Sequence, residues 1–162
     1  MVYIIIRGPL GCGKSTISKR LVGELKADYI SIDKVLEDLS LDKMDKKEGS
    51  IPARNFIKAN ESVLERVKSD LEGGRVVIFD GCFYHKEQIE HLEKNLSGKH
   101  YVFDLKAPVK LCIERDSGRN KTYGEGAARA VHKMVSRFDY GIPINVNKPL
   151  DKVIRQIKRH VG

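Results

Sequence analysis

Three glycines, a lysine and two hydroxyl side chains stand close together in the segment RGPLGCGKST, at residues 7–16. Gly8, Gly13, Lys14 and Ser15 fit the spacing G-x-x-x-x-G-K-[ST], in which small residues let the backbone wrap around a phosphate group. Successive backbone N–H groups then point at the phosphate oxygens, next to the positive end of the helix that follows. The segment therefore predicts a site for the phosphates of a nucleoside triphosphate.

The side chains of this phosphate loop have separate expected tasks. Lys14 is expected to reach the β- and γ-phosphates and to act in catalysis, and the Ser15 hydroxyl to ligate Mg²⁺. A glycine-rich turn that matches the pattern by chance is the alternative, but the segment follows the apolar run VYIII and precedes a helical pattern. The predicted nucleotide-binding residues of this segment are Gly8, Gly11, Cys12, Gly13, Lys14, Ser15 and Thr16.

Two acidic residues are predicted at the carboxyl ends of strands, which is where open parallel sheets bind ligands. Asp80 closes RVVIFD (75–80) and is expected to hold Mg²⁺ or its water and to border the substrate, although it could instead cap the turn before Gly81.

Asp33 closes DYISID (28–33) and bears on the reaction type. A hydroxyl acceptor benefits from a carboxylate that takes its proton, so we predict Asp33 as a general base that contacts the acceptor. Its alternative role, the N-cap of a short helix KVLEDL, is compatible with the first.

Basic residues are spread through a glycine-containing segment, ERDSGRNKTYGEGAAR, at residues 114–129. In-line phosphoryl transfer needs positive charge at the equatorial oxygens and exclusion of water, and a closing loop supplies both. We therefore predict a mobile lid at about 116–128, with Arg115 and Arg119 as catalytic residues. Lys121 and Arg129 share the segment, and a solvated basic loop is the alternative.

Strand and helix patterns alternate along the whole chain. Strands are expected at 2–6, 28–33, 75–80, 99–105 and 141–147, and helices at 14–25, 34–39, 52–72, 85–96, 108–115, 127–138 and 151–160. This alternation predicts one α/β domain over residues 1–162, with a parallel sheet that is covered by helices on both faces. Pro143 places the last strand at an edge of the sheet.

Composition restricts the class of protein. The chain has 162 residues, 41% of them hydrophobic, without an apolar run long enough to span a bilayer and without the features of a signal peptide. We expect a cytoplasmic protein that does not bind membranes. Cys12, Cys82 and Cys112 are odd in number and form no C-x-x-C pair, which favours reduced thiols over a disulfide or a zinc site.

The positive charge is concentrated in the last part of the chain. The formal net charge is +8, and residues 99–162 hold 14 Lys and Arg against 6 Asp and Glu. Such asymmetry indicates an anionic ligand or a well-solvated surface. A nucleic acid is a possible partner but is not favoured, because stacking aromatic residues are scarce in this part.

Taken together, these segments resemble the small P-loop kinases of hydroxyl acceptors, a group that includes adenylylsulfate kinase, chloramphenicol phosphotransferase, and shikimate and gluconate kinases. The layout is most similar to the kinase domain of phage polynucleotide kinase, through IIIRGPLGCGKST, YISIDKV, VVIFDGCFYHKEQIEHL and YVFDLKAPVKLCIERDSGRN. The resemblance implies a P-loop NTPase fold, which is a three-layer αβα sandwich with a five-stranded parallel sheet in the order 2-3-1-4-5. It also implies ATP and Mg²⁺ as cofactors, Asp33 as the base, Asp80 as the acid, and Arg115 and Arg119 in the lid.

One departure concerns the acceptor. The polynucleotide kinases carry an arginine three residues past the base that grips the acceptor's phosphate, whereas this chain has Leu36 there. Arg54 or Lys58 on the next helix could substitute. Acceptor selectivity is expected to depend on residues 34–58 and 81–86. At the other end of the site, NVNKPL (145–150) could cover a purine base with Lys148 and Pro149.

The leading hypothesis is therefore an ATP-dependent phosphotransferase whose acceptor is the hydroxyl of a small molecule or of a nucleic-acid 5′ end. A nucleoside monophosphate kinase is an alternative, against which Asp33 counts. A nucleotide-gated ATPase or binding module without an acceptor is the other. The sequence leaves open the acceptor, the choice between ATP and GTP, and the oligomeric state.

Overall fold

The computed structural model of the chain describes residues 1–120 and 122–162. Five strands form one parallel sheet in the order β2-β3-β1-β4-β5, which confirms the predicted order. The strands are β1 (Val2–Arg7), β2 (Asp28–Ser31), β3 (Val76–Gly81), β4 (Lys99–Lys106) and β5 (Ile142–Asn145). The helices are α1 (Lys14–Leu25), α2 (Ile32–Asp38), α3 (Ala53–Glu72), α4 (Lys86–Asn95), α5 (Val109–Ser117), α6 (Glu125–Val135) and α7 (Leu150–Val161).

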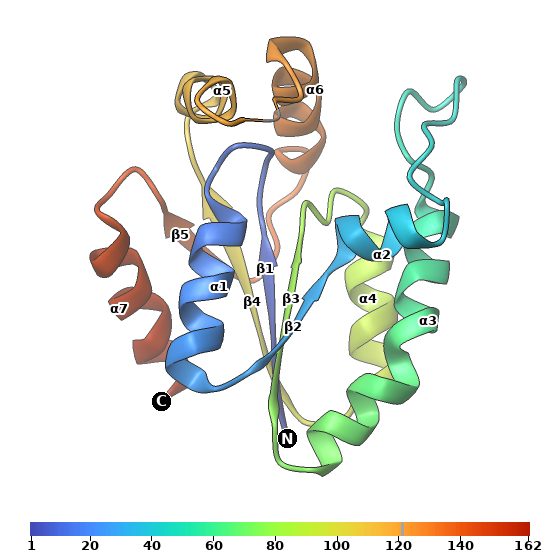
Figure 1. The fold of residues 1–162 in the computed structure, drawn as a ribbon, viewed down its shortest axis with the longest axis vertical. Coiled ribbons are helices and arrows are strands. Elements are labelled where there is room, and N and C mark those ends of the chain that lie inside the picture. The colour runs from blue at the N-terminus through green and yellow to red at the C-terminus, as the bar shows by residue number, and fades with distance from the viewer. Residues whose placement is uncertain (121) are drawn as a thin grey trace.

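The apolar run that opens the chain supplies both faces of the sheet. Successive side chains of a strand point to opposite faces, and in β1 Tyr3 and Ile5 join one buried cluster while Ile4 and Ile6 join another. The first cluster contains side chains of α2, α3 and α4, and the second contains side chains of α1 and α7. Figure 1 shows these two helix layers on either side of the sheet, as the sequence predicts.

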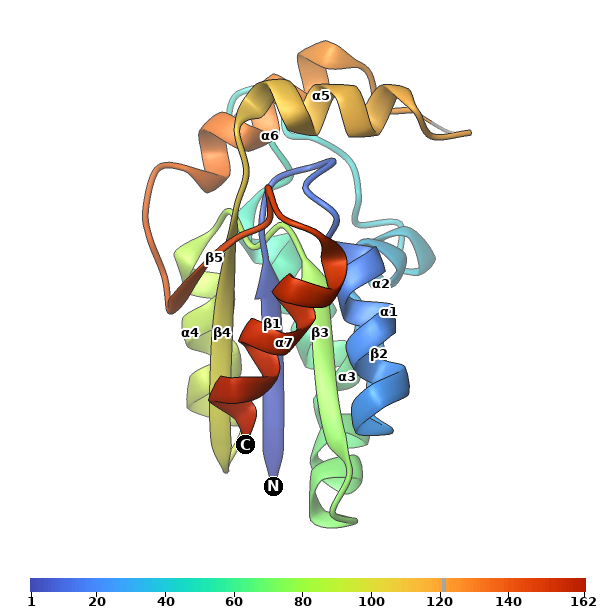
Figure 2. The same ribbon diagram turned by 90° about the vertical axis from the view of Figure 1, so that its left-hand side faces the viewer.

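Two helices lie beyond the sheet and cover neither of its faces. Figures 1 and 2 show α5 and α6 above the carboxyl ends of the strands, over the loop that joins β1 to α1. The predicted lid at about 116–128 is helical at both ends, because α5 continues to Ser117 and α6 already begins at Glu125. The side chain of Asp116 accepts hydrogen bonds from the backbone N–H groups of Tyr123 and Gly124, which closes the connection.

The segment around Asp33 differs from the prediction. β2 ends at Ser31, and Asp33 lies in the first turn of α2 instead of at the end of a strand. Asp33 is not the N-cap either, because the Ser31 hydroxyl accepts the backbone N–H of Lys34 at 3.3 Å. Serine is among the favoured N-cap residues, so the helix begins two residues earlier than the alternating pattern of DYISID suggests.

The sheet has two short edges. β2 lies at one edge and β5 at the other, and each has four residues. Pro143 lies within β5, opposite Asp104 of β4, so the prediction of an edge strand at this proline is confirmed.

Two predictions from composition can be compared with the structure. Cys12, Cys82 and Cys112 are free and buried, as reduced thiols would be. Over residues 1–120 and 122–162, the helices lack the length and apolar character needed to cross a membrane.

Candidate functional site

The phosphate loop at residues 8–13 packs tightly against its surroundings. Gly11 and Gly13 have φ values of 80° and 98°, in the left-handed region that favours glycine. A Cβ atom at Gly11 would lie 2.2 Å from the backbone oxygen of Cys112, on α5. Only glycine therefore fits where the loop passes beneath α5.

Lys14, the first residue of α1, lies folded against this loop. Its side chain is buried, and Nζ donates a hydrogen bond to the backbone oxygen of Pro9 at 2.9 Å. Burial alone would lower the pKa of Lys14, but the neighbouring Cys82, Cys12, Asp80 and Asp33 together raise it. The ammonium group of Lys14 is thus held at the loop, where it interacts electrostatically with the carboxylates of Asp80 and Asp33.

The two predicted carboxylates differ in their environment. Asp80 is 4% exposed, and its Oδ2 accepts a hydrogen bond from the hydroxyl of Tyr29 at 2.6 Å. Asp33 is reached by solvent and makes no ion pair or side-chain hydrogen bond with the described residues. The protein around Asp33 nevertheless displaces enough water to raise its pKa, with the charge of Asp80 adding to this shift and that of Lys14 opposing it.

One cavity is lined by the phosphate loop together with the predicted lid arginines, Arg115 and Arg119, and with Lys148, which is predicted to cover the nucleotide's purine base. This cavity has a volume of about 350 Å³ and is lined by Gly11, Cys12, Gly13, Thr16, Ile17, Arg115, Arg119, Val146, Lys148, Leu150 and Val153. Arg115 fixes one wall, because its guanidinium donates to the backbone oxygens of Cys12 at 2.9 Å and Val146 at 3.3 Å. Pro149 directly precedes α7 and is not among the lining residues.

Arg119 and Arg129, two further basic residues of the predicted lid segment, approach acidic side chains. Arg119 approaches Asp116 at 4.0 Å and lines the cavity. Arg129 forms a surface ion pair with Glu125 at 2.8 Å. Lys121 lies outside the described residues.

The segments predicted to select the acceptor are joined to each other. The ring Nε2 of His85 donates to the backbone oxygen of Ile51 at 2.7 Å, and the Ile51 N–H donates to the Tyr84 hydroxyl at 3.2 Å. Arg54, in the first turn of α3, forms ion pairs at 3.5 and 3.4 Å with acidic residues of this segment, Asp45 and Glu48. Lys58, one turn further along α3, is exposed.

Sequence reasoning missed Arg7, the last residue of β1. Its side chain is fully buried and forms an ion pair with Asp104 of β4, with Nη1 2.7 Å from Oδ2. Nε donates to the backbone oxygen of Phe83 at 3.1 Å, and Nη2 to those of Val135 and Phe138 at 2.7 and 3.1 Å. Arg7 therefore connects the phosphate loop's strand with the turn after β3 and with the end of α6. A charged residue that closes an apolar strand beside a phosphate loop is the signal that could have found it.

Replacing Arg7 with methionine is expected to lower the free energy of unfolding by about 3 kcal/mol, because one partner of a buried ion pair is removed. Asp104 would keep the ammonium of Lys106 at 2.9 Å and the N–H of Tyr140 at 3.2 Å, so the protein is expected to fold. Urea denaturation measures the loss.

The control is the same substitution at Arg20, whose side chain is 53% exposed and pairs with Glu24 at 2.7 Å. Exposed pairs contribute about 1 kcal/mol or less. Equal losses in the Arg7 and Arg20 variants would contradict the structural role given to Arg7.

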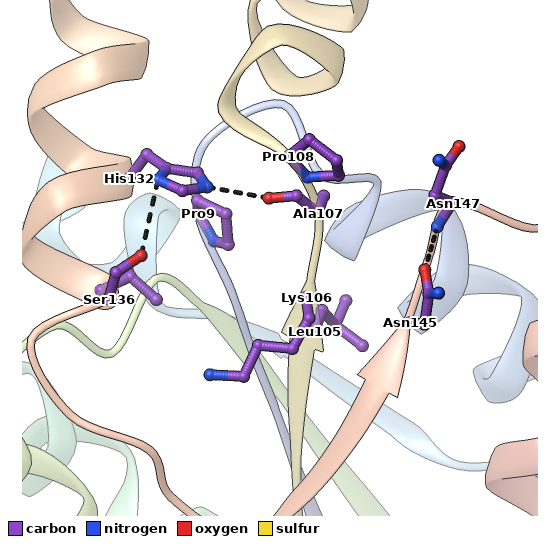
Figure 3. A pocket seen from close by; sticks show the side chains of 10 residues that line it. Pro9, Leu105, Lys106, Ala107, Pro108, His132, Ser136, Asn145 and Asn147 are labelled. Atoms are coloured by element: carbon purple, nitrogen blue, oxygen red, sulfur yellow. Dashed lines mark hydrogen bonds between the residues drawn. The ribbon is translucent and has the colours of Figure 1, made fainter.

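A second cavity, of about 390 Å³, lies between the exit of β4, α6 and the end of β5. Figure 3 shows His132 of α6 facing Ala107, with its Nε2 donating to the Ala107 oxygen at 2.8 Å, and Ser136, directly after α6, beside the other ring nitrogen. This contact ties α6 to the end of β4. The cavity contains none of the residues that the sequence predicts for the site.

Comparisons with known proteins agree with this geometry. A family model described as "AAA domain" matches residues 3–140. Similar solved structures include a sugar kinase from Janibacter sp. HTCC2649, at a TM-score of 0.79 and 14% identity over 99% of this chain and 94% of that one. A gluconokinase from Sinorhizobium meliloti 1021 has a TM-score of 0.72 at 16% identity, over 95% and 87% of the two chains. Shikimate kinase from Aquifex aeolicus vf5 has a TM-score of 0.60 at 19% identity, over 98% and 95%.

A search of curated protein sequences gave no match. The family model and the solved structures together confirm the resemblance to the small P-loop kinases and the α/β fold that it implied.

Proposed function

The chain belongs to the AAA domain family, and from this premise we propose that it transfers the γ-phosphoryl group of ATP to a hydroxyl group of an acceptor. The observation that carries the proposal is the position of Asp33. Its carboxylate interacts electrostatically with Lys14 and Asp80 and makes no ion pair with the described residues. It is therefore available to an acceptor. A carboxylate of this kind can take the proton of an attacking hydroxyl.

The nucleotide is proposed to bind with its phosphates in the loop at residues 8–13. Lys14 would release the Pro9 oxygen and donate to the β- and γ-phosphates. Ser15 and Asp80 offer one hydroxyl and one carboxylate, and Mg²⁺ prefers oxygen ligands and keeps several waters, so this donor set fits it. Mg²⁺ would neutralise charge on the phosphates when bound. Lys148 and Pro149 are proposed to lie beside the base.

The arginines are proposed to act on the group in transfer. Arg115 already lies against the phosphate loop, and Arg119 lines the same cavity. Their charges would stabilise the equatorial oxygens as the phosphoryl group moves. Movement of the connection between α5 and α6 would then exclude water from the site.

The acceptor is proposed to be a small hydroxylated molecule. The similar structures include proteins named gluconokinase, sugar kinase and shikimate kinase, which favours polyols and hydroxy acids. Arg54 and Lys58 would bind an acceptor's negative charge only after Arg54 leaves Asp45 and Glu48. A nucleoside monophosphate kinase, or an ATPase without acceptor, are the alternatives.

A coupled assay of ADP release tests the proposal, with and without a panel of sugars, sugar acids, hydroxy acids, nucleosides, nucleoside monophosphates and 5′-hydroxyl oligonucleotides. We expect a hydroxyl compound to raise ADP release above the rate with water alone. Mass spectrometry should then find one phosphate ester per ADP. Stimulation by nucleoside monophosphates alone, or hydrolysis that no acceptor changes, would overturn the proposal.

A further inference from the structure

The hydroxyl of Tyr29 binds Asp80, one of the two residues proposed to hold Mg²⁺, and no step of the proposed function uses it. Tyr29 is the second residue of β2, where it pairs with Ile78 of β3, and it is half-buried. Its hydroxyl donates to Oδ2 of Asp80 at 2.6 Å. The tyrosine thus binds the carboxylate that the proposed function assigns to Mg²⁺.

The hydrogen bond from Tyr29 offsets the cost of burying the Asp80 carboxylate. Asp80 is 4% exposed, and a buried carboxylate without a hydrogen-bond partner is costly. Among the described residues, Tyr29 is the one side chain that donates to it. The distance is in the range of strong O–H···O⁻ bonds.

We propose that Tyr29 is a positioning residue for the metal–nucleotide complex, an inference that rests on the proposed function. The phenol holds one oxygen of Asp80 and leaves the other free to accept a metal-bound water. Because β2 and β3 are hydrogen-bonded neighbours, the sheet holds Tyr29 beside the strand that carries Asp80.

The substitution Tyr29→Phe tests this, because it removes one oxygen and leaves the ring. Binding of a non-hydrolysable ATP analogue would be measured by calorimetry over a series of Mg²⁺ concentrations, and again in EDTA. Loss of a group that orients a metal ligand typically costs 10- to 100-fold in metal affinity. We expect the Mg²⁺ concentration at half-maximal enhancement of binding to rise by about this factor, with little change in EDTA.

The matched control is Tyr101→Phe, on strand β4. The Tyr101 hydroxyl is buried without a hydrogen-bond partner in the described part of the chain, so its loss should leave the Mg²⁺ requirement unchanged. Melting temperatures of both variants separate a loss of stability from a loss of metal affinity.

A double-variant cycle with Asp80→Asn tests whether Tyr29 acts through the carboxylate. If it does, Tyr29→Phe should have a much smaller effect in the Asp80→Asn background than in the wild type. The inference is overturned if Tyr29→Phe keeps the wild-type Mg²⁺ requirement, or if its effect is the same in both backgrounds. A wild-type protein that binds no ATP analogue with Mg²⁺ would instead overturn the proposed function itself.

Discussion

Lys14→Ala is expected to lower the affinity for ATP by about 10- to 100-fold, because hydrogen bonds to charged groups contribute about 1.5–3 kcal/mol. The rate of phosphoryl transfer should fall further, by about 10²–10³, since one fixed charge that faces the developing transition state is removed. The fold should survive, because Nζ has a single hydrogen-bond acceptor among the described residues, the Pro9 oxygen. Calorimetry with ATP and the coupled assay measure the two losses.

Lys19→Ala is the control, since Lys19 lies exposed on the same helix, α1. It should bind ATP as the wild type does. An unchanged affinity in Lys14→Ala itself would mean that the loop at residues 8–13 does not hold the phosphates.

Asp33→Asn is expected to reduce the rate of transfer to a hydroxyl acceptor by about 10²–10⁴, which is the usual contribution of a general base. The affinity for ATP should barely change, because Asp33 would contact the acceptor. Only the ionised carboxylate can take a proton, and its pKa is raised. The wild-type rate should therefore fall as the pH drops through a value above the usual range for aspartate, and the asparagine variant should lack this dependence.

Stability separates this role from a structural one. The raised pKa means that the folded state favours the protonated form, so ionisation of Asp33 at neutral pH costs folding free energy, and asparagine removes that cost. Ser31 caps α2, so no cap is lost either. The control is Asp38→Asn on the same helix, which breaks an exposed ion pair with Lys34 and should leave the rate unchanged. A fully active Asp33→Asn enzyme would favour the nucleoside monophosphate kinase or the ATPase.

Much of the fold could be predicted because it depends on local pattern. The run VYIII is apolar on both faces, as a central parallel strand requires, and β1 lies between β3 and β4. Pro143 excludes a central position, and the glycine-rich segment was expected to wrap tightly, as the left-handed φ values of Gly11 and Gly13 allow. The rule that ligands bind at the carboxyl ends of strands predicted that Asp33 and Asp80 lie near the phosphate loop, and the charges of both act on Lys14. Arg115 was predicted from the basic segment that contains it.

Two kinds of feature could not be predicted from the sequence. In the first, two local signals compete, and in the second, the residues in contact are far apart in the chain. In DYISID the alternating pattern favoured a longer strand, but the cap formed by Ser31 starts a helix inside it. Asp116 was expected in the lid, yet it lies in the last turn of α5 and accepts hydrogen bonds from the N–H groups of Tyr123 and Gly124. The partners of Arg7 lie up to 131 positions away, and Tyr29 lies 51 positions from Asp80, so no local pattern marks either contact.

The two edge strands also affect how copies of the chain can meet. An open sheet edge presents unpaired N–H and C=O groups on which another chain can add a strand, which is a route to aggregation. At β5, Pro143 lacks the N–H group that a pairing strand would need, and β2 has only four residues with which another chain could pair. Extension of the sheet from one molecule into the next is therefore disfavoured at both sides. Replacing Pro143 with valine would restore the N–H donor, and another chain would then pair with β5 more readily than with β2.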